Sequence, residues 1–395
     1  MLVIALLLML ALVVLGWKVS RDLFSPFVVQ PGVWLFIFTL YYALNPPYFP
    51  IQNILPLGVA LWSVCFQLAA YTVFYYTPVG RYKLYEEELK PNPYILRAYL
   101  VISWLTIPTM LFILVKLALE HDPEHMFLFM RMLNVGVDEH DVAPDFGIAN
   151  YAIAIPYILL FFTLIYSKSK KQKVLVILLN LMVGFLSMSK TNFLTLLFAV
   201  VYILYSQKKM KLRTIMILMS LFFLFSVVFQ FFRASDAEQD SFGVTNTISL
   251  YLLSNSVAFD YYSIPYSAYH WGEHCFRFFY AVAHSFGSAI PPVDTIYPFV
   301  GVPDLTNTFT ILHPFYMDFG MYGIAVFGLL YGALYGFLYK KIQNNHPVYK
   351  IIYTIFLNFI ILQFFSEYIL ANLSLTLQYI LLTIFPFLFQ IKKNS

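Results

Sequence analysis

Charge is scarce in this sequence. Only 11% of its 395 residues are Asp, Glu, Lys or Arg and 61% are hydrophobic, whereas a soluble domain is about 25% charged and about half apolar. Water cannot be the main solvent of such a chain. No nucleic-acid partner is expected for it.

Cysteine and several other signals are also rare or absent. Cys65 lies in an apolar run and Cys275 in a distant polar segment, so no disulfide framework is implied. No basic region precedes the first apolar core, because the first positive charge, Lys18, follows it. We therefore predict that residues 2–17 form a retained first span and not a cleaved signal peptide. We find no internal repeat and no matching pair of Gly/Pro-broken helices, which argues against a secondary transporter.

What the sequence does contain is a series of long apolar runs. In lipid such runs must be helices, because each backbone donor needs a partner within its own segment. The fold class is therefore an all-α, polytopic transmembrane bundle forming a single integral membrane domain. Eleven spans are predicted, at residues 2–17, 32–45, 56–76, 96–119, 148–166, 174–188, 191–205, 214–232, 311–339, 351–370 and 374–391. The least certain boundary separates the sixth and seventh spans at a polar tip around Lys190.

Basic residues set the predicted orientation, because Lys and Arg mark cytoplasmic loops. With two basic clusters, at 168–173 and 208–213, placed inside, 19 of the 24 Lys and Arg residues fall on the cytoplasmic side. This arrangement places the N-terminus outside and the C-terminus inside. Two long outer loops result, at 120–147 and 233–310. Within the second, we expect Ile248–Phe286 to form helices that lie against the membrane surface or dip into the bundle.

Five basic residues fall away from the cytoplasmic side: Lys116, Arg131, Lys190, Arg233 and Arg277. The first two are explained by snorkelling or by acidic neighbours. The other three are candidates for binding a pyrophosphate at the outer surface, since Arg and Lys can stabilise a leaving phosphate without a metal. The alternative is a structural ion pair with Asp236 or Glu273.

The second outer loop also carries aromatic and histidine-rich patterns. Tyr269 and Trp271 could stack on sugars, although interface anchoring explains most aromatic residues of this loop. The residues His270 to His274 read H-x-x-E-H, the inverted zinc-peptidase pattern, if they form a helix. Gly272 weakens that helix and no third ligand is evident, so polar side chains facing an outer cavity are the preferred interpretation.

Three glycines, Gly328, Gly332 and Gly336, recur every four residues in the ninth predicted span. Small residues at this spacing line one side of a helix. We predict a face at which another helix packs closely.

Residues 306–339, TNTFTILHPFYMDFGMYGIAVFGLLYGALYGFLY, resemble the late outer-loop-to-helix segment of bacterial O-antigen polymerases. DLFSPF at 22–27, SMSKTN at 187–192 and the position of the long outer loop agree with that family. The resemblance implies a metal-independent glycosyltransferase in the bacterial inner membrane, with no cofactor, that faces the periplasm. It would transfer a glycan from undecaprenyl pyrophosphate onto a lipid-linked repeat unit. Membrane lipids, a chain-length regulator and a flippase are the expected partners.

The chemistry of such a transfer requires a base for the acceptor hydroxyl. The related ligases carry His-Asn near Thr306 and Asn307, and here Thr replaces that His, so the base cannot be carried over. We predict His313 as base, Asp318 as its orienter or as the alternative base, and His284 as the third candidate, with Asn307 contacting glycan. Helix capping by Asp318 and an interfacial role for His313 remain the structural alternatives. The rival functions are a flippase or transporter of lipid-linked sugar, a ligase-type transferase and a membrane metallopeptidase.

Overall fold

The structure is a computed structural model that describes residues 1–46, 48–78, 90–135, 144–233, 249–294, 296–302, 305–343 and 346–389. Over these ranges the protein is helical except for one small ladder, in which β1 (Val300–Gly301) pairs antiparallel with β2 (Leu305–Thr306). The predicted all-α class is confirmed. The chain divides into two compact units, one formed by Met1–Glu86 and Thr245–Leu377 and the other by Glu87–Val244 and Gln378–Ser395.

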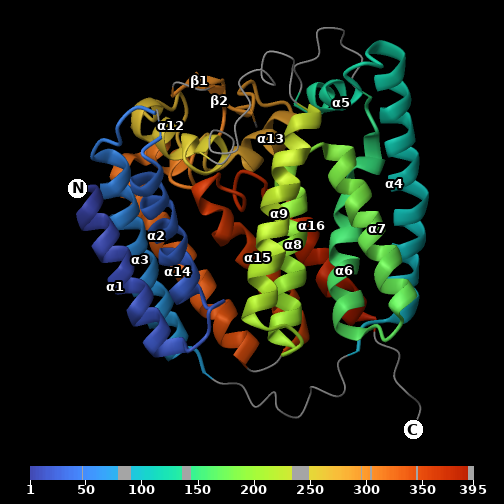
Figure 1. The fold of residues 1–395 in the computed structure, drawn as a ribbon, viewed down its shortest axis with the longest axis horizontal. Helices are drawn as coiled ribbons and strands as arrows, with labels where there is room; N and C mark the ends of the chain where they lie inside the picture. Colours follow the sequence, from blue (N-terminus) through green and yellow to red (C-terminus); the bar gives the residue numbers. More distant parts are fainter. Residues whose placement is uncertain are drawn as a thin grey trace. The chain divides into compact units, whose positions relative to one another are not determined.

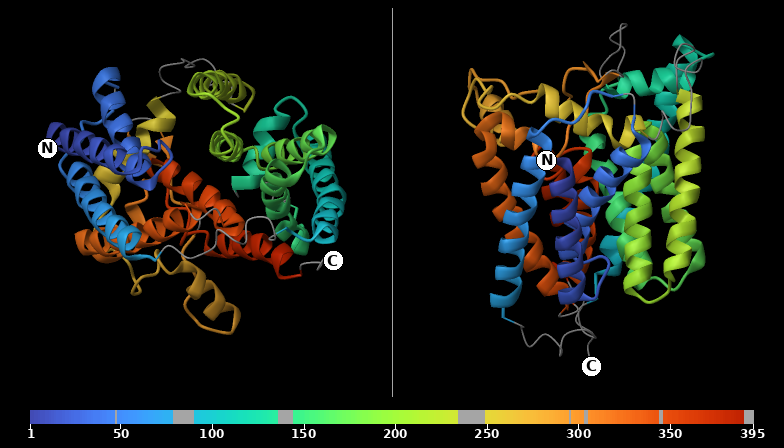
Figure 2. Two further views of the ribbon diagram at one scale, coloured as in Figure 1. Left: turned by 90° about the horizontal axis from the view of Figure 1, so that it is seen from below. Right: turned by 60° about the vertical axis from the view of Figure 1, so that its left-hand side comes forward.

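The first unit contains the first three helices of the chain, the second predicted outer loop from Thr245 onward and the helices that follow it (Figure 1). Its helices are α1 (Leu2–Ser20), α2 (Pro26–Leu44), α3 (Ile54–Tyr76), α12 (Ser254–Tyr262), α13 (Arg277–Ser285), α14 (His313–Gln343) and α15 (Pro347–Ile361), which continues as η3 (Leu362–Phe364). Figures 1 and 2 show α12, α13 and the β-ladder gathered at one end of the long helices of this unit.

The second unit consists of helices from the middle of the chain. They are α4 (Pro93–His121), α5 (Met126–Val135), η2 (Gly147–Ile153) leading into α6 (Ala154–Tyr166), α7 (Lys170–Ser187), α8 (Lys190–Ser206) and α9 (Leu212–Arg233). The boundary between the units falls within α16 (Leu373–Leu388).

Each of the eleven predicted spans overlaps a helix of the structure. Among the described residues, seven helices are long and apolar enough to cross a membrane, and α16 and most of α8 form shorter apolar helices. The protein is therefore a multi-pass membrane protein, and the count of eleven spans stays a prediction. The predicted break near Lys190 is confirmed, because α7 ends at Ser187 and Met188 adopts a left-handed conformation (φ 46°) before α8 begins.

Helices α3 and α14 pack closely along the three glycines of α14. A Cβ atom at Gly332 would lie 2.1 Å from the carbonyl oxygen of Phe66, and one at Gly336 would lie 2.4 Å from that of Ala70. No side chain fits at these distances, so glycine is required for the helices to approach. The predicted packing face is confirmed, and it holds the start of α14 beside α3.

The basic ends of the helices in the first unit lie away from α12 and α13. Tyr339, near the end of α14, donates a hydrogen bond of 3.1 Å to Asp22, which follows α1, and Lys340 lies 4.5 Å from the ring centre of Phe74. Lys18 lies in the last turn of α1, at this same end. This distribution agrees with the predicted placement of these residues on one side of the membrane, although which side they face stays a prediction.

Candidate active site

A polar cavity of about 60 Å³ lies in the first unit, where the start of α13, the start of α14 and the segment after η3 meet. At roughly 10–15 Å³ per water position, this volume corresponds to about four to six water positions. It is lined by His274, Arg277, Val293, Asp294, Tyr297, Phe309, Thr310, His313, Pro314, Ser366, Glu367, Ala371 and Asn372.

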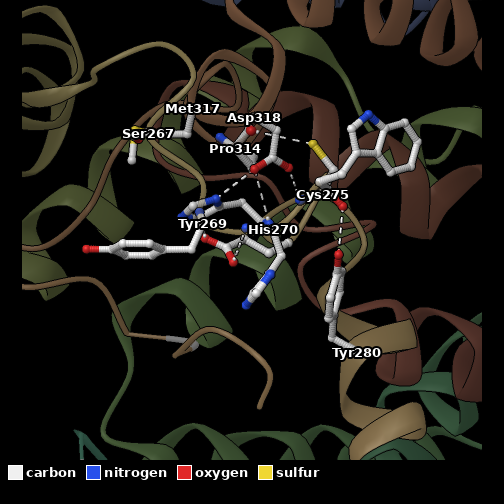
Figure 3. A network of polar contacts seen from close by, with 11 residues as sticks. Ser267, Tyr269, His270, Cys275, Tyr280, Pro314, Met317 and Asp318 are labelled. Atoms are coloured by element: carbon white, nitrogen blue, oxygen red, sulfur yellow. Dashed lines mark hydrogen bonds and ion pairs between the residues drawn. The ribbon is translucent and has the colours of Figure 1, made fainter. Parts of the chain in front are cut away.

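Asp318 and His274 form a close pair beside this cavity. The Nδ1 atom of His274 lies 2.7 Å from Oδ1 of Asp318, whose carboxylate also accepts the backbone N–H groups of His274 at 3.3 Å and Cys275 at 2.8 Å. Figure 3 shows Asp318 at the centre of this network, with Cys275 and Pro314 close by. The Asp318 side chain is fully buried, whereas that of His274 is 11% exposed and lines the cavity.

The backbone places Asp318 for this contact. It lies in the first turns of α14, two residues before Gly320, whose φ of 58° interrupts the helix. Glycine adopts this conformation without steric cost. The short helical segment that carries Asp318 can therefore take a direction different from that of the long remainder of α14.

Asp318 determines the role of the His274 ring, because both of its carboxyl oxygens accept backbone N–H groups. A carboxylate only accepts hydrogen bonds, so Nδ1 of His274 donates to it and Nε2 is left as an acceptor. Nε2 makes no hydrogen bond to any residue that the structure describes. A histidine oriented by a carboxylate through one nitrogen, with the other free, is the arrangement of a general base.

The segment around His274 is held in turns and not in a helix. Glu273 accepts the backbone N–H groups of Tyr269 (2.9 Å) and His270 (3.1 Å), and Gly272 adopts a φ of 69°. The helix required by the metallopeptidase interpretation is absent from these residues. Within the described ranges, no three His, Cys, Asp or Glu side chains are grouped as metal ligands.

Cys275 is a buried neighbour of the pair and is not a candidate nucleophile. Its thiol lies 3.4 Å from the carbonyl oxygen of Pro314. Burial, followed by the nearby negative charge of Asp318, raises the pKa of the Cys275 thiol above its ordinary value. The thiol therefore stays protonated, and the thiolate is the reactive form.

His313 lines the same cavity but does not contact Asp318. Its Nδ1 lies 2.6 Å from Oγ of Ser263, and its ring stacks on Phe309 with the centres 4.1 Å apart. Tyr297 packs against the His313 ring in an edge-to-face arrangement, with the ring centres 4.6 Å apart. The predicted pairing of His313 with Asp318 is thus replaced by two separate pairs, Asp318 with His274 and Ser263 with His313.

Arg277 is the first residue of α13 and lines the cavity. Its Nε atom donates a hydrogen bond of 2.6 Å to the carbonyl oxygen of Val293, and it forms no ion pair with a described residue. Glu273 is not its partner, because that carboxylate accepts backbone N–H groups. Asp236, the other predicted partner, lies outside the described residues.

The other two predicted cations belong to the second unit. Lys190 begins α8 and Arg233 ends α9, and both side chains lie outside the described parts of the structure. Of the three, Arg277 is the one whose side chain the structure describes, and it lines the cavity. Joint binding of a pyrophosphate by all three residues stays a prediction.

The remaining predicted residues do not line the cavity. His284 is exposed on α13, with Nδ1 2.8 Å from the carbonyl oxygen of Ser288. Tyr269 and Trp271 are 93% and 75% exposed, and Asn307 follows β2. Their proposed contacts with glycan stay predictions.

Glu367 is a cavity residue that the sequence interpretation missed. Its carboxylate is buried and accepts hydrogen bonds from three backbone N–H groups and from the hydroxyl of Tyr331. A lone acid within the apolar run at 351–370 was the available signal, because intramembrane carboxylates are usually functional.

Fold and site together define a multi-pass membrane protein with a polar pocket lined by histidine, carboxylate and arginine side chains. Residues 22–364 match the protein family described as "Putative O-antigen polymerase". The chain belongs to this O-antigen polymerase family, as its sequence resemblance predicted. Membership implies polymerase activity on lipid-linked repeat units. The comparisons with curated proteins and with solved structures gave no match.

Proposed function

We propose that the protein is a glycosyltransferase that polymerises oligosaccharide repeat units carried on undecaprenyl pyrophosphate, at the outer face of the cytoplasmic membrane. The observation that carries this proposal is the Asp318–His274 pair beside a cavity that Arg277 also lines. Such a site combines an oriented base with a cation, the two groups that glycosyl transfer from a pyrophosphate requires.

In the proposed reaction, a hydroxyl of the incoming repeat unit attacks the anomeric carbon of the donor glycan. The new C–O bond forms as the bond from that carbon to the phosphate oxygen breaks, and its electron pair leaves with undecaprenyl pyrophosphate. Nε2 of His274 takes the proton of the attacking hydroxyl. The Asp318 carboxylate stabilises the imidazolium that results.

Arg277 would bind the pyrophosphate as negative charge develops on it. Its Nε is held by the carbonyl oxygen of Val293, which leaves the two terminal nitrogens for a bidentate phosphate contact. The arginine supplies a fixed positive charge, so the proposed step is metal-independent. His313 is the second candidate base in the same cavity, with Ser263 as its partner.

The test is complementation of a deletion strain that otherwise makes the polymer, with the surface glycan displayed on a gel. Cells carrying His274→Ala or Arg277→Ala should export single repeat units and no ladder of longer chains. Retention of normal chain lengths by both variants would contradict the proposed site. Accumulation of lipid-linked units on the cytoplasmic side in the deletion strain would instead identify a flippase.

A further inference from the structure

The helix pair α15 and α16 is interrupted beside the cavity. Regular structure ends with η3 at Phe364 and resumes with α16 at Leu373. Non-helical backbone between apolar membrane helices is tolerated where it is buried in protein or lines a water-filled cavity. Here the interruption does line a cavity, through Ser366, Glu367, Ala371 and Asn372.

Glu367 organises this interruption from within. One of its carboxylate oxygens accepts the N–H of Ile369 at 2.7 Å, and the other accepts those of Leu370 at 2.9 Å and Ala371 at 2.6 Å. The hydroxyl of Tyr331, from α14, donates to the first oxygen. These four donors occupy the carboxylate, so Glu367 acts on the shape of the segment and is not free to take a proton from substrate.

Two of the side chains that line the cavity from this segment, Ser366 and Asn372, are neutral and polar. Asn372 is exposed, and its side-chain amide makes no hydrogen bond to a described residue. The Ser366 hydroxyl makes only a long contact, 3.5 Å, with the carbonyl oxygen of Glu367. Thr310 adds another hydroxyl to the same lining. Amides and hydroxyls both donate and accept, as sugar hydroxyls do.

We propose that residues 366–372 form the subsite for the acceptor sugar, in which Ser366 and Asn372 bind hydroxyls of the incoming repeat unit and Glu367 is the positioning residue. This inference rests on the proposed function. In this proposal Arg277 binds the anionic pyrophosphate, and the neutral polar side chains bind the sugar.

The test uses purified full-length enzyme in lipid nanodiscs, with lipid-linked polymer as limiting donor and the lipid-linked repeat unit varied as acceptor. Neutral hydrogen bonds contribute about 0.5–1.5 kcal/mol each, so Asn372→Ala and Ser366→Ala should each raise the acceptor KM about 2- to 10-fold. The kcat should stay within about twofold. Free repeat-unit oligosaccharide, released from its lipid by mild acid, should lose potency as a competitor by the same factor.

Variants of Glu367 test whether this residue positions the acceptor subsite. Glu367→Gln keeps one acceptor oxygen and should raise the acceptor KM less than Glu367→Ala, while the KM for the donor stays unchanged in both. Ser285→Ala is the matched control, because Ser285 is exposed on α13 and bonds only the carbonyl oxygen of Ala281.

Unchanged acceptor KM and unchanged competition in Asn372→Ala and Ser366→Ala would overturn the subsite, whether or not the Glu367 variants fold. An increase confined to the donor KM would overturn it as well. Failure of the wild-type enzyme to join repeat units would refute the proposed function itself, so the two failures are distinguishable.

Discussion

Replacing His274 and Asp318, singly and together, tests whether the two side chains act as one catalytic unit. His274→Ala removes the base. Asp318→Asn keeps an oxygen that can accept the N–H of Cys275, but it turns an amide N–H₂ toward Nδ1, 2.7 Å from the carboxylate oxygen in the wild type. The imidazole then donates from Nε2, and the free acceptor is lost.

The size of the effect follows from the role assigned to the pair. A positioned general base contributes about 10²- to 10⁴-fold to the rate. His274→Ala should therefore lower kcat by about that factor, and Asp318→Asn should approach the same loss. Since either change removes the same base, the double variant should be no slower than His274→Ala by more than a few-fold.

Single-turnover extension of lipid-linked glycan, followed on gels with purified variants, measures these rates. His270→Ala is the matched control, because His270 belongs to the same H-x-x-E-H pattern but is exposed and does not line the cavity. Losses that multiply in the double variant would show that the two residues act independently. A His274→Ala enzyme within tenfold of wild type, with His313→Ala inactive, would assign the base to His313.

Three further predictions concern stability and reactivity. Gly332→Ala should lower the free energy of unfolding by about 1–3 kcal/mol through overpacking, because its Cβ would lie 2.1 Å from the carbonyl oxygen of Phe66. Thermal unfolding in detergent measures this change. Gly32→Ala is the control, because its Cβ would meet nothing nearer than 3.9 Å. Asp260→Ala should cost about 1–3 kcal/mol, because it leaves the buried backbone N–H of Leu55 and the part-buried N–H of Gln52 without an acceptor where α3 begins. Asp260→Asn should restore part of the loss, and equal melting temperatures would contradict this role. Burial raises the pKa of the Cys275 thiol, so maleimide labelling of the folded protein should stay slow as the pH rises from 7 to 9. Labelling as fast as that of the denatured protein would refute the burial of this thiol.

Local sequence was sufficient to predict most of the helices. Apolar runs in lipid have no alternative to the helix, so each predicted span coincides with one. The break at Met188 could also be predicted, because a polar tip lies there between two basic clusters. The packing face at Gly332 could be predicted from the four-residue spacing of the glycines. The family resemblance of residues 306–339 agrees with the match over 22–364.

The residue pairs of the site could not be predicted in this way. His274 and Asp318 are 44 positions apart, and His313 and Ser263 are 50 apart, so only the folded chain shows which histidine meets the carboxylate. The H-x-x-E-H pattern raised a zinc site at His274, and Gly272 argued against it, but nothing in the spacing indicated that Asp318 is the partner of this histidine.

The sequence by itself determined that the protein lies in a membrane, where its helices are and to which family it belongs, because hydropathy and local spacing depend on neighbouring residues. Tertiary structure decided which histidine pairs with the Asp318 carboxylate, which of the three suspected cations is described at the cavity, and which groups hold the acid that follows α15. Glu367 shows the difference most clearly: the sequence displays a lone carboxylate in an apolar run, and only the fold supplies the three backbone N–H groups and the tyrosine that hold it. Hydrogen bonds are short and directional, so they depend on positions that long-range packing alone sets.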